Sequence, residues 1–112
     1  MNQIALFKPT LTNKDYKVIN NSLKTGWLTH GPNNLKFEKF FCKVTGSKYA
    51  ISMNSCTSAL ECALKIIKKK GEVIIPSWTW VSTANAVLNT GNIPVLSDVE
   101  INSRNIDRKS VV

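Results

Sequence analysis

The stretch KYAISMNSCTSAL, residues 48–60, joins a short apolar run to the start of a segment with helical periodicity. Residues 48–53 predict a short buried strand, and the apolar positions of residues 56–69 recur with the spacing of a helix. Four of the seven residues in NSCTSAL, residues 54–60, are Asn, Ser or Thr. Such small polar side chains leave room for a ligand at the first turn of the helix. The stretch therefore predicts a strand–turn–helix unit with an accessible helix N-terminus.

The same alternation continues along the chain. GEVIIP, residues 71–76, predicts a second strand, residues 78–89 predict a helix, and IPVLS, residues 93–97, predicts a third strand. The expected stripe of that helix consists of Val81, Ala84, Asn85 and Leu88. Short apolar strands that alternate with helices predict an α/β fold, here part of a three-layer parallel sheet with right-handed crossover helices.

Two helices are expected before this core, over residues 11–24 and 34–45. Thr12 is a good N-cap with Asp15 three residues later, as in a capping box. Gly26 and Gly46 are expected to end the two helices. The second helix has an aromatic stripe formed by Phe37, Phe40, Phe41 and Val44.

The chain is therefore expected to form one incomplete domain in three parts. Residues 1–47 are a helical segment, residues 48–98 are a β-α-β-α-β core that carries the site, and residues 99–112 are a polar tail. The chain has 112 residues, no apolar run long enough to span a bilayer and no secretory signal at its start, so the cytoplasm is the expected compartment.

The cysteine and histidine content argues against a metal site and a disulfide framework. The three cysteines form no CxxC pair, and His30 is the single histidine. The net charge of +8 leaves a small basic nucleic-acid binder as an alternative. However, the only dense basic run, residues 68–70, stands where a helix should end, a position that favours cations, and has no aromatic residues within it.

The segment 54–58 has the chemistry of a phosphate site. The first amides of a helix lack intrahelical acceptors and carry a partial positive charge, and Thr57 and Ser58 add hydroxyl groups. The alternative is an ordinary N-cap by Asn54 or Ser55 with no ligand. No Walker lysine follows and no GxGxxG motif is present, which disfavours NTPase and dinucleotide folds.

The stretch PSWTWVSTANAV, residues 76–87, follows the next strand at the same edge of the sheet. Trp78 and Trp80 either pack in the core or stack on a planar ring in the cleft. A phosphate site after one strand and an aromatic side chain after the next would together hold a flat phosphorylated heterocycle. Pyridoxal 5′-phosphate (PLP) fits that description.

Four motifs in this order resemble the N-terminal part of the DegT/DnrJ/StrS sugar aminotransferases, which are fold-type-I PLP-dependent enzymes. The resemblance runs from about residue 4 to residue 98. The motifs are GWLTHGP at 26–32, NSCTSAL at 54–60, IIPSWTWVSTANAV at 74–87 and GNIPVLSDVE at 91–100.

The resemblance implies cofactor contacts for four residues. Thr57 and the backbone of Ser58 would hold the phosphate of PLP, and Trp80 would stack on its ring, whereas Trp78 is expected to pack. Cys56 stands where the family usually has a glycine that allows close backbone approach, and Ser58 stands where it usually has an alanine.

The resemblance also places GWLTHGP near the substrate, so Gly26, Trp27, Thr29 and His30 are candidate substrate contacts. A surface-loop role is the alternative for His30.

The activity implied is transfer of an amino group from an amino acid, expected to be glutamate, to a nucleotide-linked keto-sugar for polysaccharide or other glycan synthesis by a homodimer. No catalytic residue is expected within this chain, because the family's lysine that binds PLP covalently lies further along. The chain is thus expected to be an inactive fragment, or a half of a split enzyme that binds its partner. A family member that dehydrates sugars is a further alternative.

Overall fold

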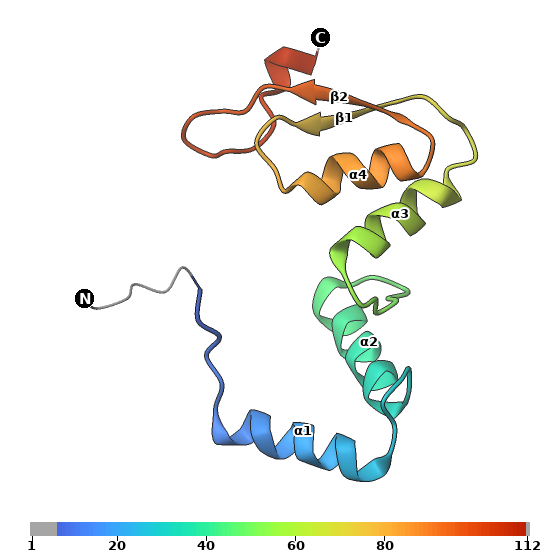
Figure 1. The fold of residues 1–112 in the computed structure, drawn as a ribbon, viewed down its shortest axis with the longest axis vertical. Coiled ribbons are helices and arrows are strands. Elements are labelled where there is room, and N and C mark those ends of the chain that lie inside the picture. Colours follow the sequence, from blue (N-terminus) through green and yellow to red (C-terminus); the bar gives the residue numbers. More distant parts are fainter. Residues whose placement is uncertain (1–6, 112) are drawn as a thin grey trace. The chain divides into compact units, whose positions relative to one another are not determined.

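The computed structural model describes residues 7–111, and the chain divides into two compact units at the junction of Ser52 and Met53. Figure 1 shows the helices of the first unit in blue and green and the sheet of the second unit in yellow to red.

The first unit contains two helices, α1 (Asn13–Thr25) and α2 (Pro32–Thr45), as the sequence predicts. The amide and the hydroxyl group of Thr12 both donate hydrogen bonds of 2.7 Å to Oδ2 of Asp15. Gly26 ends α1 with φ = 71°, and Gly46 ends α2 with φ = 72°. Both glycines occupy the left-handed region, where a side chain is disfavoured.

The apolar stripes of these two helices are exposed within the described residues. Phe37, Phe40 and Val44 of α2 are each more than half exposed, as are Tyr16 and Leu23 of α1. Helical periodicity therefore predicted where the helices lie, but these side chains have no apolar cover in the described structure.

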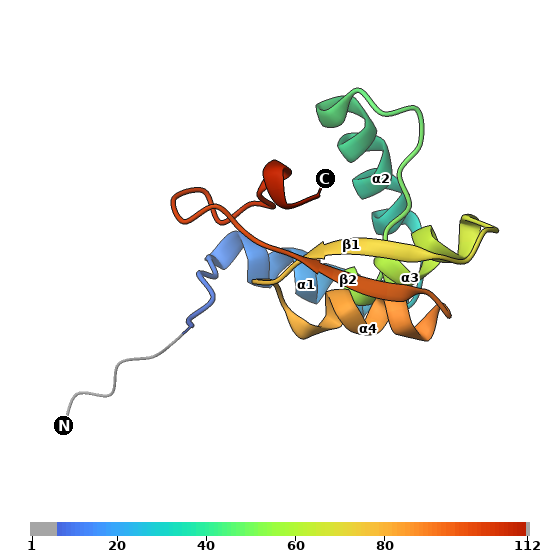
Figure 2. The ribbon, with the colours of Figure 1, turned by 90° about the horizontal axis from the view of Figure 1, so that it is seen from above.

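The second unit contains α3 (Cys56–Ile66), β1 (Glu72–Pro76), α4 (Val81–Asn89), β2 (Ile93–Ser97) and a 3₁₀ helix, η1 (Arg108–Val111). The strands β1 and β2 pair in parallel, with Ile74 opposite Val95, and α4 is the crossover between them. Figures 1 and 2 show α4 along one face of this sheet and α3 beside α4. This is the α/β arrangement that the alternating pattern predicts.

The predicted strand over residues 48–53 is wrong. These residues form no strand in the structure, and the described sheet has two strands rather than three. A strand exists only where a neighbouring backbone completes its ladder, and no segment within residues 7–111 pairs with residues 48–53. The apolar composition of residues 48–53 was therefore not enough to make them a strand.

The predicted stripe of the second crossover helix is also wrong. The helix α4 begins at Val81 rather than at residue 78, and it buries Ala86 and Val87 while Val81 and Leu88 are exposed. Thr90, just after the helix, is also buried. Ser77 explains the later start, because its amide donates to the Ser97 carbonyl over 2.8 Å and so extends the strand pairing.

The tail after β2 is more ordered than its polar composition predicts. Val99 and Ile106 form an isolated antiparallel bridge, and the Asp107 amide donates to the Asp98 carbonyl over 2.8 Å. The hydroxyl groups of Ser97 and Ser110 lie 2.8 Å apart. The tail thus folds back onto the carboxyl end of β2 (Figure 2).

Candidate cofactor site

The first turn of α3 contains the predicted phosphate site. Ser55 is the N-cap, as one of the two sequence alternatives proposed, and its hydroxyl oxygen accepts a hydrogen bond of 3.1 Å from the Ser58 amide. The Ser55 and Ser58 hydroxyl groups lie 2.9 Å apart. The Ser58 amide is therefore already engaged with the cap, and the Ser58 hydroxyl group lies within hydrogen-bonding distance of it.

The residues between them are free to bind. Within residues 7–111 the Cys56 and Thr57 amides donate no hydrogen bond, and the Thr57 hydroxyl group has no hydrogen-bond partner either. The Thr57 side chain is half-buried and Cys56 is exposed. Two adjacent amides with a hydroxyl at a helix N-terminus fit the oxygens of a phosphate dianion.

The first turn of α4 presents the predicted aromatic side chain. Trp80 is the N-cap residue of α4 and is 78% exposed, so its indole is available for stacking. In Figure 1, α3 and α4 run in the same direction, with their first turns towards the end of the sheet where β1 terminates. That end is where ligands bind in parallel sheets.

Trp78 has a different environment from Trp80. The guanidinium carbon of Arg104 lies 4.3 Å from the centroid of the Trp78 ring. Arg104 itself has φ = 60°, in the left-handed region, and its amide donates to the Glu100 carbonyl over 2.9 Å. Trp78 is 58% exposed, so the structure gives it a cation–π contact with the tail rather than the core packing that the sequence analysis expected.

The loop GWLTHGP lies in the first unit, between α1 and α2. Gly26 is the C-cap of α1, which accounts for its φ of 71° without a ligand. Trp27 is 58% exposed, and its ring lies against Gly31, where an added Cβ would meet ring carbon Cε3 at 2.9 Å. Thr29 is exposed, and Nε2 of His30 lies 3.5 Å from Oε1 of Glu38. No contact described here tests a substrate role for these residues.

Glu38 and Ser52 are prominent polar residues that the sequence analysis missed. The amide and the hydroxyl group of Ser52 each donate a hydrogen bond of 2.8 Å to Oε1 of Glu38. These bonds, with a smaller effect of His30, lower the pKa of Glu38 from its ordinary value of 4.5. A glutamate on the polar side of an amphipathic helix gives no sequence signal of this kind, because its partners are far along the chain.

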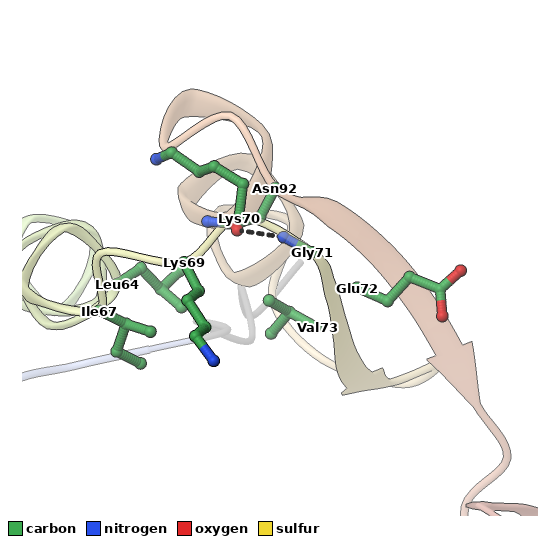
Figure 3. Close-up of a pocket in the computed structure, with 8 residues that line it drawn as sticks. All are labelled: Leu64, Ile67, Lys69, Lys70, Gly71, Glu72, Val73 and Asn92. Atoms are coloured by element: carbon green, nitrogen blue, oxygen red, sulfur yellow. Dashed lines mark hydrogen bonds between the residues drawn. The ribbon is translucent and has the colours of Figure 1, made fainter.

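The lysines that follow α3 lie at the opposite end of the unit. A pocket of about 260 Å³ lies where α3 ends and β1 begins. Figure 3 shows the residues that line it and the hydrogen bond of 3.1 Å from the Gly71 amide to Oδ1 of Asn92. Nζ of Lys70 donates to the carbonyl oxygen of Thr90. The residues lining the pocket are Leu64, Ile67, Lys69, Lys70, Gly71, Glu72, Val73 and Asn92.

Neither a metal centre nor a membrane segment is evident in the part of the chain that the structure describes. Within residues 7–111, no group of three or more His, Cys, Asp or Glu side chains could hold a metal ion. None of the helices described has both the length and the apolar character needed to cross a bilayer.

Comparison with known proteins identifies the family of this chain. Residues 9–112 match the model of the DegT/DnrJ/EryC1/StrS aminotransferase family. The chain is 41% identical over 101 residues to the spore coat polysaccharide biosynthesis protein SpsC of Bacillus subtilis, a match that covers 88% of this chain and 26% of SpsC. This chain thus spans about a quarter of the length of that relative.

The fold comparison agrees. Spr1654 of Streptococcus pneumoniae, solved in PLP, PMP and apo forms, superposes with a TM-score of 0.87 at 25% identity, over 96% of this chain and 28% of Spr1654. The GDP-4-keto-6-deoxy-D-mannose-3-dehydratase of E. coli, solved with bound hydrated PLP, superposes with a TM-score of 0.79 at 29% identity. The match covers 95% of this chain and 29% of the dehydratase. The architecture is that of the N-terminal part of fold-type-I PLP-dependent enzymes, and the chain belongs to the DegT/DnrJ/EryC1/StrS aminotransferase family.

Proposed function

We propose that this chain supplies the phosphate and ring contacts for PLP in an enzyme that acts on nucleotide-linked sugars. The free amides of Cys56 and Thr57, together with the Thr57 hydroxyl, would hold the phosphate. The exposed Trp80 indole would cover the pyridine ring. The observation that carries the proposal is the pair of unpaired amides at the first turn of α3, in a family whose relatives are solved with PLP and PMP.

Ser58 has a supporting role in this proposal. Its amide donates to the Ser55 hydroxyl oxygen, so Ser58 is proposed to stabilise the first turn, and only its hydroxyl group would be available to the phosphate. The exposed Cys56 thiol would lie beside the phosphate, since its own amide is one of the proposed donors.

The proposed reaction is transfer of an amino group from an amino acid, with glutamate as the donor, to a keto-sugar linked to a nucleotide. PLP, when bound, supplies the electron sink that amino transfer requires. The family description and the role of SpsC in spore coat polysaccharide biosynthesis support this reaction and a product used in glycan synthesis.

The proposed substrate-binding loop comprises Gly26, Trp27, Thr29 and His30. A nucleotide-linked sugar as substrate is supported by ColD, a GDP-4-keto-6-deoxymannose-3-dehydratase of similar fold that was solved with bound GDP-perosamine. That similarity also supports sugar dehydration as a second candidate reaction. Both reactions would use the same phosphate and ring contacts of this chain.

We further propose that this chain alone holds PLP without turning over a substrate. Lys65 lies in the last turn of α3, and residues 68–70 follow that helix, so these lysines lie at the opposite end of α3 from Thr57. A covalent bond to PLP needs a lysine beside the ring. A homodimer is the proposed assembly of the enzyme, and the exposed aromatic stripe of α2 supports such an association.

PLP binding to the purified chain tests the proposal. PLP should quench tryptophan fluorescence, with W80F losing most of the quenching and W78F keeping it, whereas pyridoxal, which lacks the phosphate, should bind more weakly by about tenfold or more. Borohydride treatment should fix no PLP on a lysine of this chain. Equal quenching by pyridoxal, or an unchanged W80F signal, would contradict the proposed site.

A further inference from the structure

The carboxylate of Glu38 lies between two segments that are remote in sequence. Its Oε1 accepts hydrogen bonds of 2.8 Å from the amide and from the hydroxyl group of Ser52, and lies 3.5 Å from Nε2 of His30. The Glu38 side chain is 15% exposed, whereas His30 is 58% exposed. A single oxygen on α2 therefore contacts both the GWLTHGP loop and the residue that ends the first unit.

Asn34, one turn earlier on α2, makes the same connection. Its Oδ1 accepts a hydrogen bond of 3.1 Å from the Gly31 amide, and its Nδ2 donates to the Ser52 hydroxyl oxygen over 3.2 Å. Since Asn34 and Glu38 are four residues apart, they project from the same face of the helix. Together they form the bracket, defined here as Asn34, Glu38 and their contacts with Gly31, His30 and Ser52.

The bracket gives the Ser52 amide a hydrogen-bond acceptor that strand pairing does not provide within the described residues. The segment 48–53 has no partner strand in residues 7–111. The Ser52 amide nevertheless donates a hydrogen bond to the Glu38 carboxylate, which is a stronger acceptor than a neutral carbonyl group. A carboxylate that accepts two short hydrogen bonds holds its partners more firmly than a neutral acceptor would. The backbone at Ser52 is thus fixed relative to α2.

We propose that Glu38 is a positioning residue that fixes the substrate loop 26–31 and the residue leading into NSCTSAL as one arrangement. This inference rests on the proposed function, because the proposed function assigns substrate binding to the loop and phosphate binding to NSCTSAL. Glu38 touches neither substrate nor cofactor in this proposal; it acts through Ser52 and His30. Its loss should therefore loosen both segments at once, and PLP binding should weaken without any phosphate contact having been removed.

Amide hydrogen exchange of the complete chain without PLP tests the bracket itself. In E38A, exchange at the Ser52 and Gly31 amides should accelerate by about tenfold, while amides in the middle of α2 keep their protection. In E38Q, the side-chain oxygen still accepts from Ser52, so most of the Ser52 protection should return. The matched control is E61A, which removes a helix carboxylate that accepts from Asn89 in the other unit.

A general loss of structure would give a different pattern. If E38A accelerated exchange throughout α2, Glu38 would be a residue of general stability and the proposal would be wrong. If exchange at Ser52 did not change in E38A, the bracket would not hold that backbone and the proposal would be wrong.

PLP binding then tests the functional consequence separately. The affinity for PLP, measured by tryptophan fluorescence, should fall by about threefold to tenfold in E38A and stay near the wild-type value in E38Q and E61A. Absence of PLP binding by the wild-type chain would contradict the proposed function and the role of Glu38 in PLP binding. The hydrogen-exchange result would still show whether the bracket exists. Normal PLP affinity in E38A with accelerated exchange would overturn the positioning role alone.

Discussion

The hydroxyl oxygen of Ser55 accepts a hydrogen bond of 3.1 Å from the Ser58 amide, and the hydroxyl groups of the two residues lie 2.9 Å apart. This pairing decides which atoms of the first turn of α3 remain for an anion. The Ser58 amide serves the helix cap, and the Cys56 and Thr57 amides are left without acceptors. The cap and the proposed anion site therefore use different amides of the four residues 55–58.

Removal of the cap should destabilise α3. The substitution S55A deletes the acceptor of the Ser58 amide, so the free energy of unfolding should fall by about 1 kcal/mol. S58A keeps the amide and loses only a hydroxyl group, so its effect should be smaller. Chemical denaturation followed by circular dichroism measures both, and a larger loss in S58A than in S55A would contradict the cap geometry.

Removal of the free hydroxyl should affect ligand binding rather than stability. T57V keeps the shape of the side chain but has no hydroxyl group to donate, so PLP affinity should fall by about fivefold to twentyfold, the equivalent of about 1–2 kcal/mol. The melting temperature of the ligand-free chain should change little, because the Thr57 hydroxyl has no partner among residues 7–111. Fluorescence titration with PLP and with pyridoxal separates the phosphate contribution from that of the ring.

Gly31 should tolerate no side chain. A Cβ at this position would meet Cε3 of Trp27 at 2.9 Å, so G31A should displace the indole and change its emission spectrum. The control is G71A, where an added Cβ meets no atom within 4 Å. We expect a loss of stability of about 1–3 kcal/mol in G31A and little change in G71A. An unchanged Trp27 environment in G31A, read in a W78F/W80F background, would contradict the close packing.

Asp15 should make the first helix sensitive to acid. Hydrogen bonds from the hydroxyl and then the amide of Thr12 lower the pKa of Asp15 from its ordinary value of 3.8. The stabilisation is therefore complete above the ordinary pKa and is lost as pH falls through the lowered value. Helical content, followed by circular dichroism below about pH 4, should fall less steeply in D15N, which cannot ionise. Identical pH profiles would exclude this contribution.

Arg104 should stabilise the tail through the ring of Trp78. R104N keeps a residue that tolerates φ = 60° but removes the guanidinium group 4.3 Å from the ring centroid. The free energy of unfolding should fall by about 0.5–1 kcal/mol, as for an exposed cation–π pair. W78L, which removes the aromatic ring, should reduce the effect of R104N in a double-mutant cycle. Full additivity of the two substitutions would show that the stacking contributes nothing.

The elements predicted correctly were those that depend on neighbours in sequence. The helices α1 and α2, with Thr12, Gly26 and Gly46 at their ends, follow from interactions that span four residues or fewer. The strands β1 and β2 were predicted from short apolar runs bounded by Gly and Pro. The position of NSCTSAL at the start of α3 follows in the same way.

The tertiary structure alone decided features that depend on distant partners. The segment 48–53 has the composition of a strand but no partner within residues 7–111, and the buried face of α4 is set by contact with the sheet, which selects Ala86 and Val87. The sequence left both Asn54 and Ser55 as possible N-caps, and only the backbone conformation at the turn shows that Ser55 is the N-cap.

Sequence by itself thus determined the helices, the parallel pair of strands and the place of the candidate phosphate site, because capping and periodicity act within a few residues. Only the tertiary structure showed that Glu38 holds Ser52 and lies near His30, and that Arg104 lies on Trp78. The physical reason is that these contacts are made by side chains whose partners the chain brings close only after it has folded.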